Sequence, residues 1–263
     1  MNRIDSLFSR LRRKKKKALI AYVTAGFPSL KILPKLVTAL AEQGVDLVEI
    51  GIPFSDPLAD GPTIQAASSE ALRRGVTMDQ VFEQVRRIRS KVDGLPIVFM
   101  SYYNPVFHYG IRSFCRKAAV LGVDGLIVPD LPPEESRDLS HEAGKSGIAL
   151  IFLASPTSSP DRLRRIAQVS RGFIYCVSLT GVTGARDGLT VNFKIVEQLK
   201  RITKKPVCVG FGISTAGQAA GYARRADGVI IGSALINAMR RFSGDPVQGA
   251  AVFIRKVKSG WHS

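Results

Sequence analysis

Short, continuously apolar runs recur along the chain, and each is followed by a segment with helical periodicity. A run that is apolar at every position, rather than at alternate ones, is typical of a parallel strand buried on both faces. The strands predicted in this way are Leu19–Val23, Leu47–Ile50, Ile97–Met100, Gly125–Val128, Ala149–Leu153, Phe173–Val177, Val207–Val209 and Gly228–Ile231. Eight strand-then-helix units in 263 residues predict an α/β fold, a single (β/α)8 or TIM barrel domain spanning residues 1–263.

The helices are expected between these strands. The predicted helices are Leu36–Gln43 (beginning near Leu33), Thr77–Lys91, Ile111–Leu121, Pro133–Ser146, Asp161–Val169, Val191–Arg201, Thr215–Arg225 and Asp245–Lys258. Thr77 is expected to be an N-cap, and Pro133 suits the first helical position. A doubly wound open sheet is the main alternative, but it predicts Gly-x-Gly-x-x-Gly after the first strand. The segment Thr24–Ser29 lacks that motif.

Residues 1–17 form a basic extension before the first strand. Its apolar residues have the spacing i, i+3, i+4 and i+7: Ile4, Leu7, Phe8 and Leu11. This pattern predicts a short amphipathic helix that packs on the barrel, with a membrane-surface helix as the alternative. The following apolar stretch is too short for a secretory signal peptide.

The chain carries 38 Lys and Arg against 21 Asp and Glu, a net charge of +17. Such a surplus suggests nucleic-acid or anionic-membrane binding, but the basic residues beyond the Arg10–Lys17 run are scattered pairs without interleaved aromatics. We therefore expect a solvated surface and no specific nucleic-acid binding. No run reaches 18 apolar residues, which predicts no membrane span. Three cysteines without a Cys-x-x-Cys favour a reducing cytoplasm, and three histidines predict no metal site.

One connection is longer than the others. About 45 residues separate the second predicted strand from the third. They include a polar segment, Pro53–Thr63, and a helical insertion, Ile64–Arg74. Long loops in compact domains are usually functional, and a loop that follows a barrel strand lies on the catalytic face.

Glycine-rich turns follow three late strands, at Thr180–Gly184, Gly210–Ser214 and Gly232-Ser233. Glycine lets a backbone N–H approach an anion closely, and a helix N-terminus adds partial positive charge. Barrels often bind phosphate with the loops after their seventh and eighth strands. These turns therefore predict a phosphate site, with simple turns as the alternative.

Candidate acids stand at strand ends. Glu49 lies within an otherwise apolar strand, near the end where barrel chemistry occurs, and burial would raise its pKa toward a range useful for proton transfer. In the following loop, Asp56 before Pro57 and Asp60 before Gly61 both suit turns, and local sequence does not choose between them.

For the other candidate side chains, the sequence does not distinguish a structural role from a functional one. Asp130 suits a turn or helix cap as well as a site, and Tyr175 suits the core as well as substrate contact. Asp124 is a further acid candidate. The cysteines Cys115, Cys176 and Cys208 are expected to be small buried hydrophobes.

The segment Leu47-Val-Glu-Ile-Gly-Ile-Pro-Phe-Ser-Asp-Pro-Leu-Ala-Asp-Gly-Pro-Thr-Ile-Gln65 resembles the signature of the tryptophan synthase α subunit family. Further resemblance lies in Tyr22–Gly26, Tyr103–Phe107, Val128–Pro132, Thr180–Arg186, Gly210–Ser214 and Gly232–Ala234. It spans roughly residues 18–258. The resemblance implies a lyase that cleaves indole-3-glycerol phosphate to indole and glyceraldehyde 3-phosphate in tryptophan biosynthesis.

The resemblance also implies roles for individual residues. Glu49 matches the family's catalytic acid/base, and Asp60 matches its second catalytic carboxylate. The resemblance, and not local sequence, therefore selects Asp60 over Asp56 as the catalytic aspartate. The residues that match the phosphate cradle are Gly184, Phe211, Gly212, Gly232 and Ser233. Those that match positions around the indole and glycerol are Tyr22, Met100, Ile127, Tyr175 and Thr183.

The family's partner is a β subunit that contains pyridoxal phosphate, in an αββα assembly, and the α chain itself needs neither cofactor nor metal. The loops with Asp60 and Thr183 are implied to close over the ligand. Alternatives are a catalytically poor subunit kept as an activator of its partner, and a sugar-phosphate isomerase on the same kind of barrel. Intact Glu49 and Asp60 argue against the first, and the Pro53–Gln65 segment argues against the second.

Overall fold

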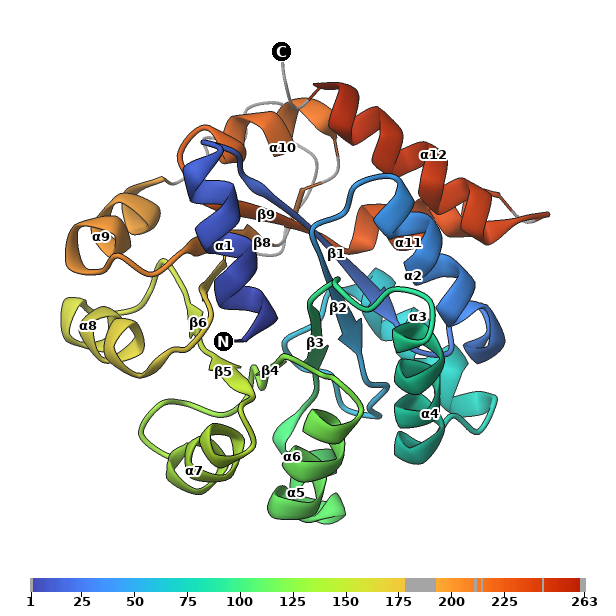
Figure 1. Ribbon diagram of the computed structural model, residues 1–263, viewed down its shortest axis with the longest axis horizontal. Helices are drawn as coiled ribbons and strands as arrows, with labels where there is room; N and C mark the ends of the chain where they lie inside the picture. The colour runs from blue at the N-terminus through green and yellow to red at the C-terminus, as the bar shows by residue number, and fades with distance from the viewer. Residues whose placement is uncertain (1, 178–192, 211, 214, 243, 261–263) are drawn as a thin grey trace.

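The computed structural model describes residues 2–177, 193–210, 212–213, 215–242 and 244–260. Its centre is a parallel sheet of nine strands in the order β5-β4-β3-β2-β1-β9-β8-β7-β6. Figure 1 shows the sheet curled into a nearly closed barrel, with helices around its outside. The predicted (β/α)8 barrel is confirmed.

The strands coincide with the apolar runs, and nearly every strand residue is buried, because both sheet faces are covered. They are β1 (Ala18–Thr24), β2 (Leu47–Gly51), β3 (Ile97–Met100), β4 (Gly125–Ile127), β5 (Ala149–Ile151), β6 (Leu153–Ala154), β7 (Ile174–Val177), β8 (Val207–Gly210) and β9 (Gly228–Ile231). β5 and β6 are one predicted strand, interrupted at Phe152. β5 pairs with β4, and β6 pairs with β7. The two edges of the sheet are therefore joined here by the continuous chain through Phe152 and not by strand pairing.

The helices are α1 (Arg3–Arg13), α2 (Leu33–Glu42), α3 (Pro62–Arg73), α4 (Met78–Arg89), α5 (Tyr103–Tyr109), α6 (Ile111–Val120), α7 (Arg137–Lys145), α8 (Pro160–Val169), α9 (Lys194–Ile202), α10 (Ala216–Ala223), α11 (Ser233–Arg241) and α12 (Pro246–Ser259). A short 3-10 turn, Leu30–Ile32, precedes α2. Thr77 caps α4 in a reciprocal capping box with Gln80, as predicted. The insertion helix after β2 is α3.

The predicted start of one helix was wrong. α7 begins at Arg137 and not at Pro133, because residues 133–135 form a turn and the Ser136 hydroxyl donates to the Pro133 carbonyl at 2.9 Å. Sequence reasoning also missed α5. Its first backbone N–H, at Tyr103, is bound by the Asp130 carboxylate at 2.9 and 3.1 Å. Asp130 therefore acts as a cap, but for a helix that follows another strand.

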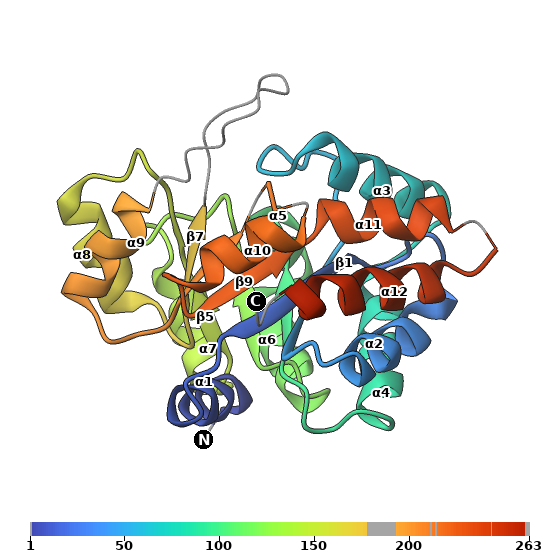
Figure 2. The same cartoon turned by 90° about the horizontal axis from the view of Figure 1, so that it is seen from above.

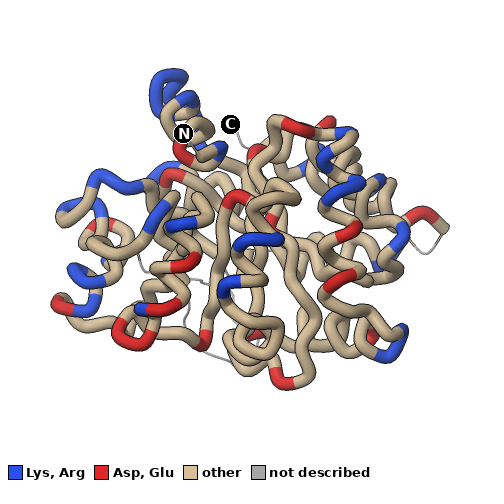
Figure 3. The backbone as a smooth tube through the Cα atoms, turned by 60° about the horizontal axis from the view of Figure 1, so that its bottom comes forward, with Lys and Arg blue, Asp and Glu red and all other residues tan. Residues whose placement is uncertain are grey.

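Helix α1 covers the N-terminal end of the barrel. Ile4, Leu7, Phe8 and Leu11 are buried, and the Phe8 ring lies 5.9 Å from that of Phe173. Figure 2 shows α1 at the end of the barrel opposite to the loop that precedes α3. Basic residues lie on α1 and on the outer helices (Figure 3). A membrane-surface helix would expose its apolar face to lipid, but in α1 this face is buried against the barrel.

A buried ion-pair network ties α1 to the barrel. Asp124, which is 5% exposed, accepts hydrogen bonds from Arg89 at 2.7 Å, Arg3 at 3.1 Å and the Ile97 N–H at 2.9 Å. Arg89 also donates to the backbone carbonyls of Val92 and Asp93, in the loop after α4. Asp124 is thus a structural acid at the end of the barrel away from the strand C-termini.

Replacing Asp124 is expected to destabilise the fold strongly. Asp124→Asn leaves the charge of Arg89, whose side chain is 11% exposed, without its main partner, and breaking a buried pair in this way costs about 3–5 kcal/mol. Urea unfolding followed by circular dichroism measures this change. The matched control is Asp93→Asn, because the Asp93 side chain pairs with Arg3 but is 86% exposed. We expect the control to change the unfolding free energy by less than about 1 kcal/mol, and equal effects of the two variants would contradict the interpretation.

Candidate active site

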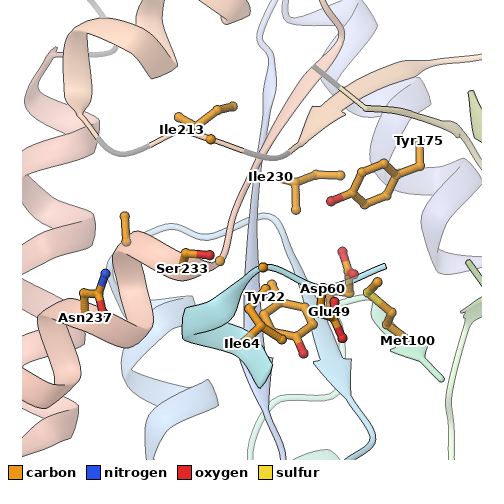
Figure 4. A pocket seen from close by; sticks show the side chains of 14 residues that line it. Tyr22, Glu49, Asp60, Ile64, Met100, Tyr175, Ile213, Ile230, Ser233 and Asn237 are labelled. Atoms are coloured by element: carbon orange, nitrogen blue, oxygen red, sulfur yellow. The ribbon is translucent and has the colours of Figure 1, made fainter. Parts of the chain in front are cut away.

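A cavity of about 240 Å³ opens at the C-terminal ends of the strands. Figure 4 shows side chains from several strands and from the loops that follow them converging on it. The residues that line it are Tyr22, Glu49, Asp60, Gly61, Ile64, Met100, Tyr175, Gly212, Ile213, Ile230, Gly232, Ser233, Ala234 and Asn237. Most of its wall is apolar, and its polar groups are few, as in sites that bind small molecules.

Glu49 enters the cavity because of strand geometry. Successive residues of β2 face opposite sides, so Glu49 faces the barrel interior while Val48 and Ile50 face the helices. The parallel register places Glu49 beside Tyr22 of β1 and Val98 of β3. Glu49 is 1% exposed, and neither carboxyl oxygen has a hydrogen-bond partner among the described residues.

The surroundings of Glu49 favour its neutral form. Burial is the main cause and the nearby Asp60 carboxylate adds to it, together raising the pKa of Glu49 to about 8. A carboxyl group with this pKa is mostly protonated at neutral pH and can give up its proton. The sequence also predicted that burial raises the pKa of Glu49.

Asp60 reaches the same cavity from the loop after β2. Burial raises its pKa to about 6, and a hydrogen bond from the Tyr102 hydroxyl, at 3.1 Å, acts in the opposite direction. Asp56 is exposed on the same loop and does not line the cavity. Geometry thus separates the two aspartates that local sequence left equivalent.

Two glycines make room for two tyrosine hydroxyls. A Cβ at Gly51 would lie 2.1 Å from the Tyr22 hydroxyl, and one at Gly210 would lie 2.2 Å from the Tyr175 hydroxyl. Each glycine sits at the end of its strand, so its missing side chain lets the tyrosine point across the barrel mouth. Both tyrosines were predicted as substrate contacts, and both line the cavity with Met100.

The far side of the cavity is made by backbone. Gly232 precedes α11, and Ser233 and Ala234 form its first turn, where N–H groups lack intrahelical partners. Gly212 has a φ of +72°, a conformation that favours glycine. Gly212, Gly232 and Ser233, which were predicted to hold phosphate, thus line the same cavity as the carboxyl groups, and their role as a phosphate cradle stays a prediction.

One predicted site residue lies away from the cavity, and three are not described. Ile127 is buried in β4 and is not part of the cavity wall. Thr183, Gly184 and Phe211 lie outside the described residues, as does the start of the helix predicted at Val191.

The structure also adds residues that sequence reasoning missed. Ile64 lies in the first turn of α3, Ile213 follows Gly212, Ile230 lies in β9, and Asn237 lies one helical turn after Ser233 in α11. The i, i+4 spacing of Ser233 and Asn237 was a signal available for the last of these.

A parallel barrel with two buried carboxyl groups at its mouth and a helix N-terminus across the cavity defines an enzyme that moves protons on a small anionic substrate. The comparisons with known proteins agree. Residues 8–259 match the family model described as tryptophan synthase alpha chain. The tryptophan synthase alpha chain of Geotalea daltonii is 47% identical over 93% of this chain and 92% of its own. That of Dehalococcoides mccartyi is 44% identical over 98% of each.

Solved structures give the same answer. Tryptophan synthase subunit alpha from Legionella pneumophila superposes with a TM-score of 0.92 at 38% identity, covering 100% of this chain and 99% of its own. Tryptophan synthase from Mycobacterium tuberculosis does so with 0.90 at 37%, with the same coverage. The chain belongs to the tryptophan synthase alpha chain family. It is a lyase that cleaves indole-3-glycerol phosphate in tryptophan biosynthesis, as the resemblance implied.

The described residues lack both a metal-binding cluster and a membrane-spanning helix. They contain no group of three or more His, Cys, Asp or Glu side chains arranged to hold a metal ion. Within the same ranges, no helix has both the length and the apolar character that crossing a membrane would need.

Substituting Gly51 tests the packing of the cavity. In Gly51→Ala the new methyl group cannot coexist with the Tyr22 ring, so the ring must leave its place. Misplacing one wall of a reactive site costs about 10- to 100-fold in catalytic efficiency. The measurement is kcat/KM for indole release. Gly217→Ala is the matched control, because a Cβ there meets nothing within 4 Å, and it should leave kcat/KM unchanged. A Gly51→Ala enzyme as active as this control would show that the wall tolerates the change.

Proposed function

We propose that Glu49 and Asp60 divide the work of the retro-aldol cleavage between them. The observation that carries the proposal is a pair of carboxyl groups, Glu49 and Asp60, that line one cavity at the barrel mouth. Burial there raises the pKa of Glu49 to about 8 and that of Asp60 to about 6. At neutral pH Glu49 is mostly protonated and Asp60 mostly ionised. Environments that separate two carboxyl groups in this way assign one as acid and the other as charge stabiliser.

Glu49 gives its proton to C3 of the indole ring, which creates the indolenine tautomer with positive charge on the ring nitrogen. Glu49, now a carboxylate, takes the proton from the adjacent glycerol hydroxyl. The electron pair of that O–H bond forms the aldehyde, and the broken C–C bond returns its electrons to the ring. Indole and glyceraldehyde 3-phosphate result, and Glu49 is protonated again. No water or external proton is consumed.

Asp60 stabilises the charge that develops on the ring nitrogen. Its Oδ1 atom is buried and has no hydrogen-bond partner among the described residues, so it is free to accept the ring N–H. A fixed negative charge in a site that excludes water stabilises a developing positive charge more than the same group in solvent would.

The remaining cavity residues hold the substrate. Tyr22, Met100 and Tyr175 provide apolar surface for the indole, and the N–H groups around Gly212, Gly232 and Ser233 provide the phosphate site. We include Thr183, Gly184, Phe211 and Ile127 in the proposal on the family resemblance alone.

The partner is a β subunit in an αββα assembly, and pyridoxal phosphate belongs to that subunit rather than to this chain. Two exposed apolar side chains, on the segments that follow β2 and β3, support a docking face: Leu58, 92% exposed on the Asp60 loop, and Phe107, 61% exposed on α5. We propose further that the chain is one domain without a cofactor or metal of its own, and that it works in the cytoplasm.

Removing the acid tests the reaction assignment. Glu49→Gln keeps the shape but cannot donate and reclaim a proton, so we expect kcat for indole release to fall about 10²- to 10⁴-fold. Activity is measured on the purified chain with and without a β subunit. The comparison variant is Glu42→Gln, at the end of α2 and outside the cavity. Substantial turnover by Glu49→Gln would rule out the proposed acid/base role. If the wild-type chain releases no indole either alone or with the β subunit, yet still binds a phosphate ligand, the result would favour a catalytically poor subunit that activates its partner.

The pH dependence follows from the two pKa values. Activity requires ionised Asp60, so kcat/KM should rise with pH through about 6. It also requires protonated Glu49, so kcat/KM should fall as pH rises through about 8. The expected profile is a bell whose limbs belong to the coupled pair. A rate that keeps rising above pH 9 would show that Glu49 does not act as the initial acid.

A further inference from the structure

We propose that Tyr102 is a positioning residue that fixes which oxygen of Asp60 is offered to the substrate. The proposal rests on the proposed function of Asp60. Tyr102 does not line the cavity and was not recognised from the sequence. Its side chain acts on the reaction only through Asp60.

The contacts of Tyr102 hold it rigidly. It follows β3, is 4% exposed, and its ring stacks on Phe54 with centroids 5.2 Å apart. Its hydroxyl accepts a hydrogen bond from the Ala59 N–H at 2.9 Å. The same hydroxyl donates to Asp60 Oδ2 at 3.1 Å. Because the Ala59 N–H occupies an acceptor site of the hydroxyl, its single proton is left to point at Asp60.

The Asp60 carboxylate depends on this bond for its orientation. Its loop carries exposed neighbours, and its backbone is tied to α3 by Gln65, whose amide donates to the Asp60 carbonyl at 2.8 Å. That bond holds the main chain but leaves the side chain free to rotate. Within the described residues, Tyr102 is the group that binds the carboxylate. With Oδ2 held, Oδ1 is the oxygen left without a partner.

The same bond also favours the charged form of Asp60. The titratable groups around it are Glu49 on β2, Tyr22 on β1, Tyr175 on β7 and Tyr102 after β3, and the carboxyl group of Asp130 acts on Tyr102. The described cavity wall has no Lys or Arg to stabilise the carboxylate. The Tyr102 hydrogen bond is therefore the interaction that lowers the pKa of Asp60 against the effect of burial.

The test is Tyr102→Phe in the full chain assembled with its β subunit, beside Tyr103→Phe as the matched control. The Phe ring can keep the contact with Phe54 while losing the hydroxyl. The hydroxyl of Tyr103 makes no hydrogen bond among the described residues, and its ring packs on Phe107 at 5.8 Å. Two quantities are measured: kcat and KM for indole release, and the pKa of Asp60 from the ¹³C resonance of its carboxyl carbon in the isolated chain. Asp60→Asn identifies that resonance by its loss.

We expect the pKa of Asp60 to rise in Tyr102→Phe from about 6 toward about 7, because the charged form loses a hydrogen bond. At neutral pH kcat should fall about tenfold, with a smaller change in KM. The control should match the wild type in both quantities. An unchanged pKa of Asp60 in Tyr102→Phe would overturn the proposal, even if activity fell, because a purely structural role in holding the loop would give that result.

The same variants distinguish the proposed role of Tyr102 from the proposed role of Asp60, on which it rests. If Asp60→Asn retains full activity, Asp60 has no catalytic role and the proposed function fails for that residue. If Asp60→Asn is inactive while Tyr102→Phe titrates and turns over like the wild type, the role of Asp60 stands and only the role of Tyr102 is refuted.

Discussion

Two carboxyl groups are kept out of water at the mouth of the barrel, and much of the structure serves that constraint. A buried carboxylate without hydrogen bonds is costly, so the group neutralises instead and its pKa rises. Glu49 meets this cost by staying protonated. Asp60, less deeply buried, accepts one hydrogen bond and ionises at lower pH. One hydrogen bond and some solvent exposure thus separate the pKa values of the two carboxyl groups, and the proposed division into acid and charge stabiliser rests on this difference.

A site that sacrifices stability in this way needs a rigid scaffold. The strands that carry Tyr22 and Glu49 are paired in register and buried along their whole length. At the opposite end, α1 closes the barrel, and Asp124 joins α1, α4 and the start of β3 in one ion-pair network. The buried charge of Asp124 is therefore satisfied by several donors at the end of the barrel that α1 covers, whereas at the mouth Glu49 stays neutral and Asp60 accepts one hydrogen bond among the described residues.

Sequence patterns predict the parts of this structure that depend on local order. Apolar runs mark the strands, and a glutamate inside one of them stands out at once. Asp60 could be chosen over Asp56 only through the family resemblance, because both suit a turn. The Tyr102–Asp60 bond joins residues 42 positions apart and leaves no local trace. Helix α5 was missed for a similar reason, since its cap, Asp130, follows a different strand.

The surplus of basic residues contrasts with the proposed phosphate site, which uses none of them among the described residues. The described residues of the wall include neither Lys nor Arg, although the chain has 38 of them. A cation close to Glu49 would favour its carboxylate and lower the pKa that lets it act as an acid. Backbone N–H groups at the start of α11 attract an anion through partial charges that fall off within one helical turn. A phosphate bound by dipoles at one end of the cavity, as we propose, leaves the proton of Glu49 in place at the other end, whereas a nearby ammonium or guanidinium group would favour its loss.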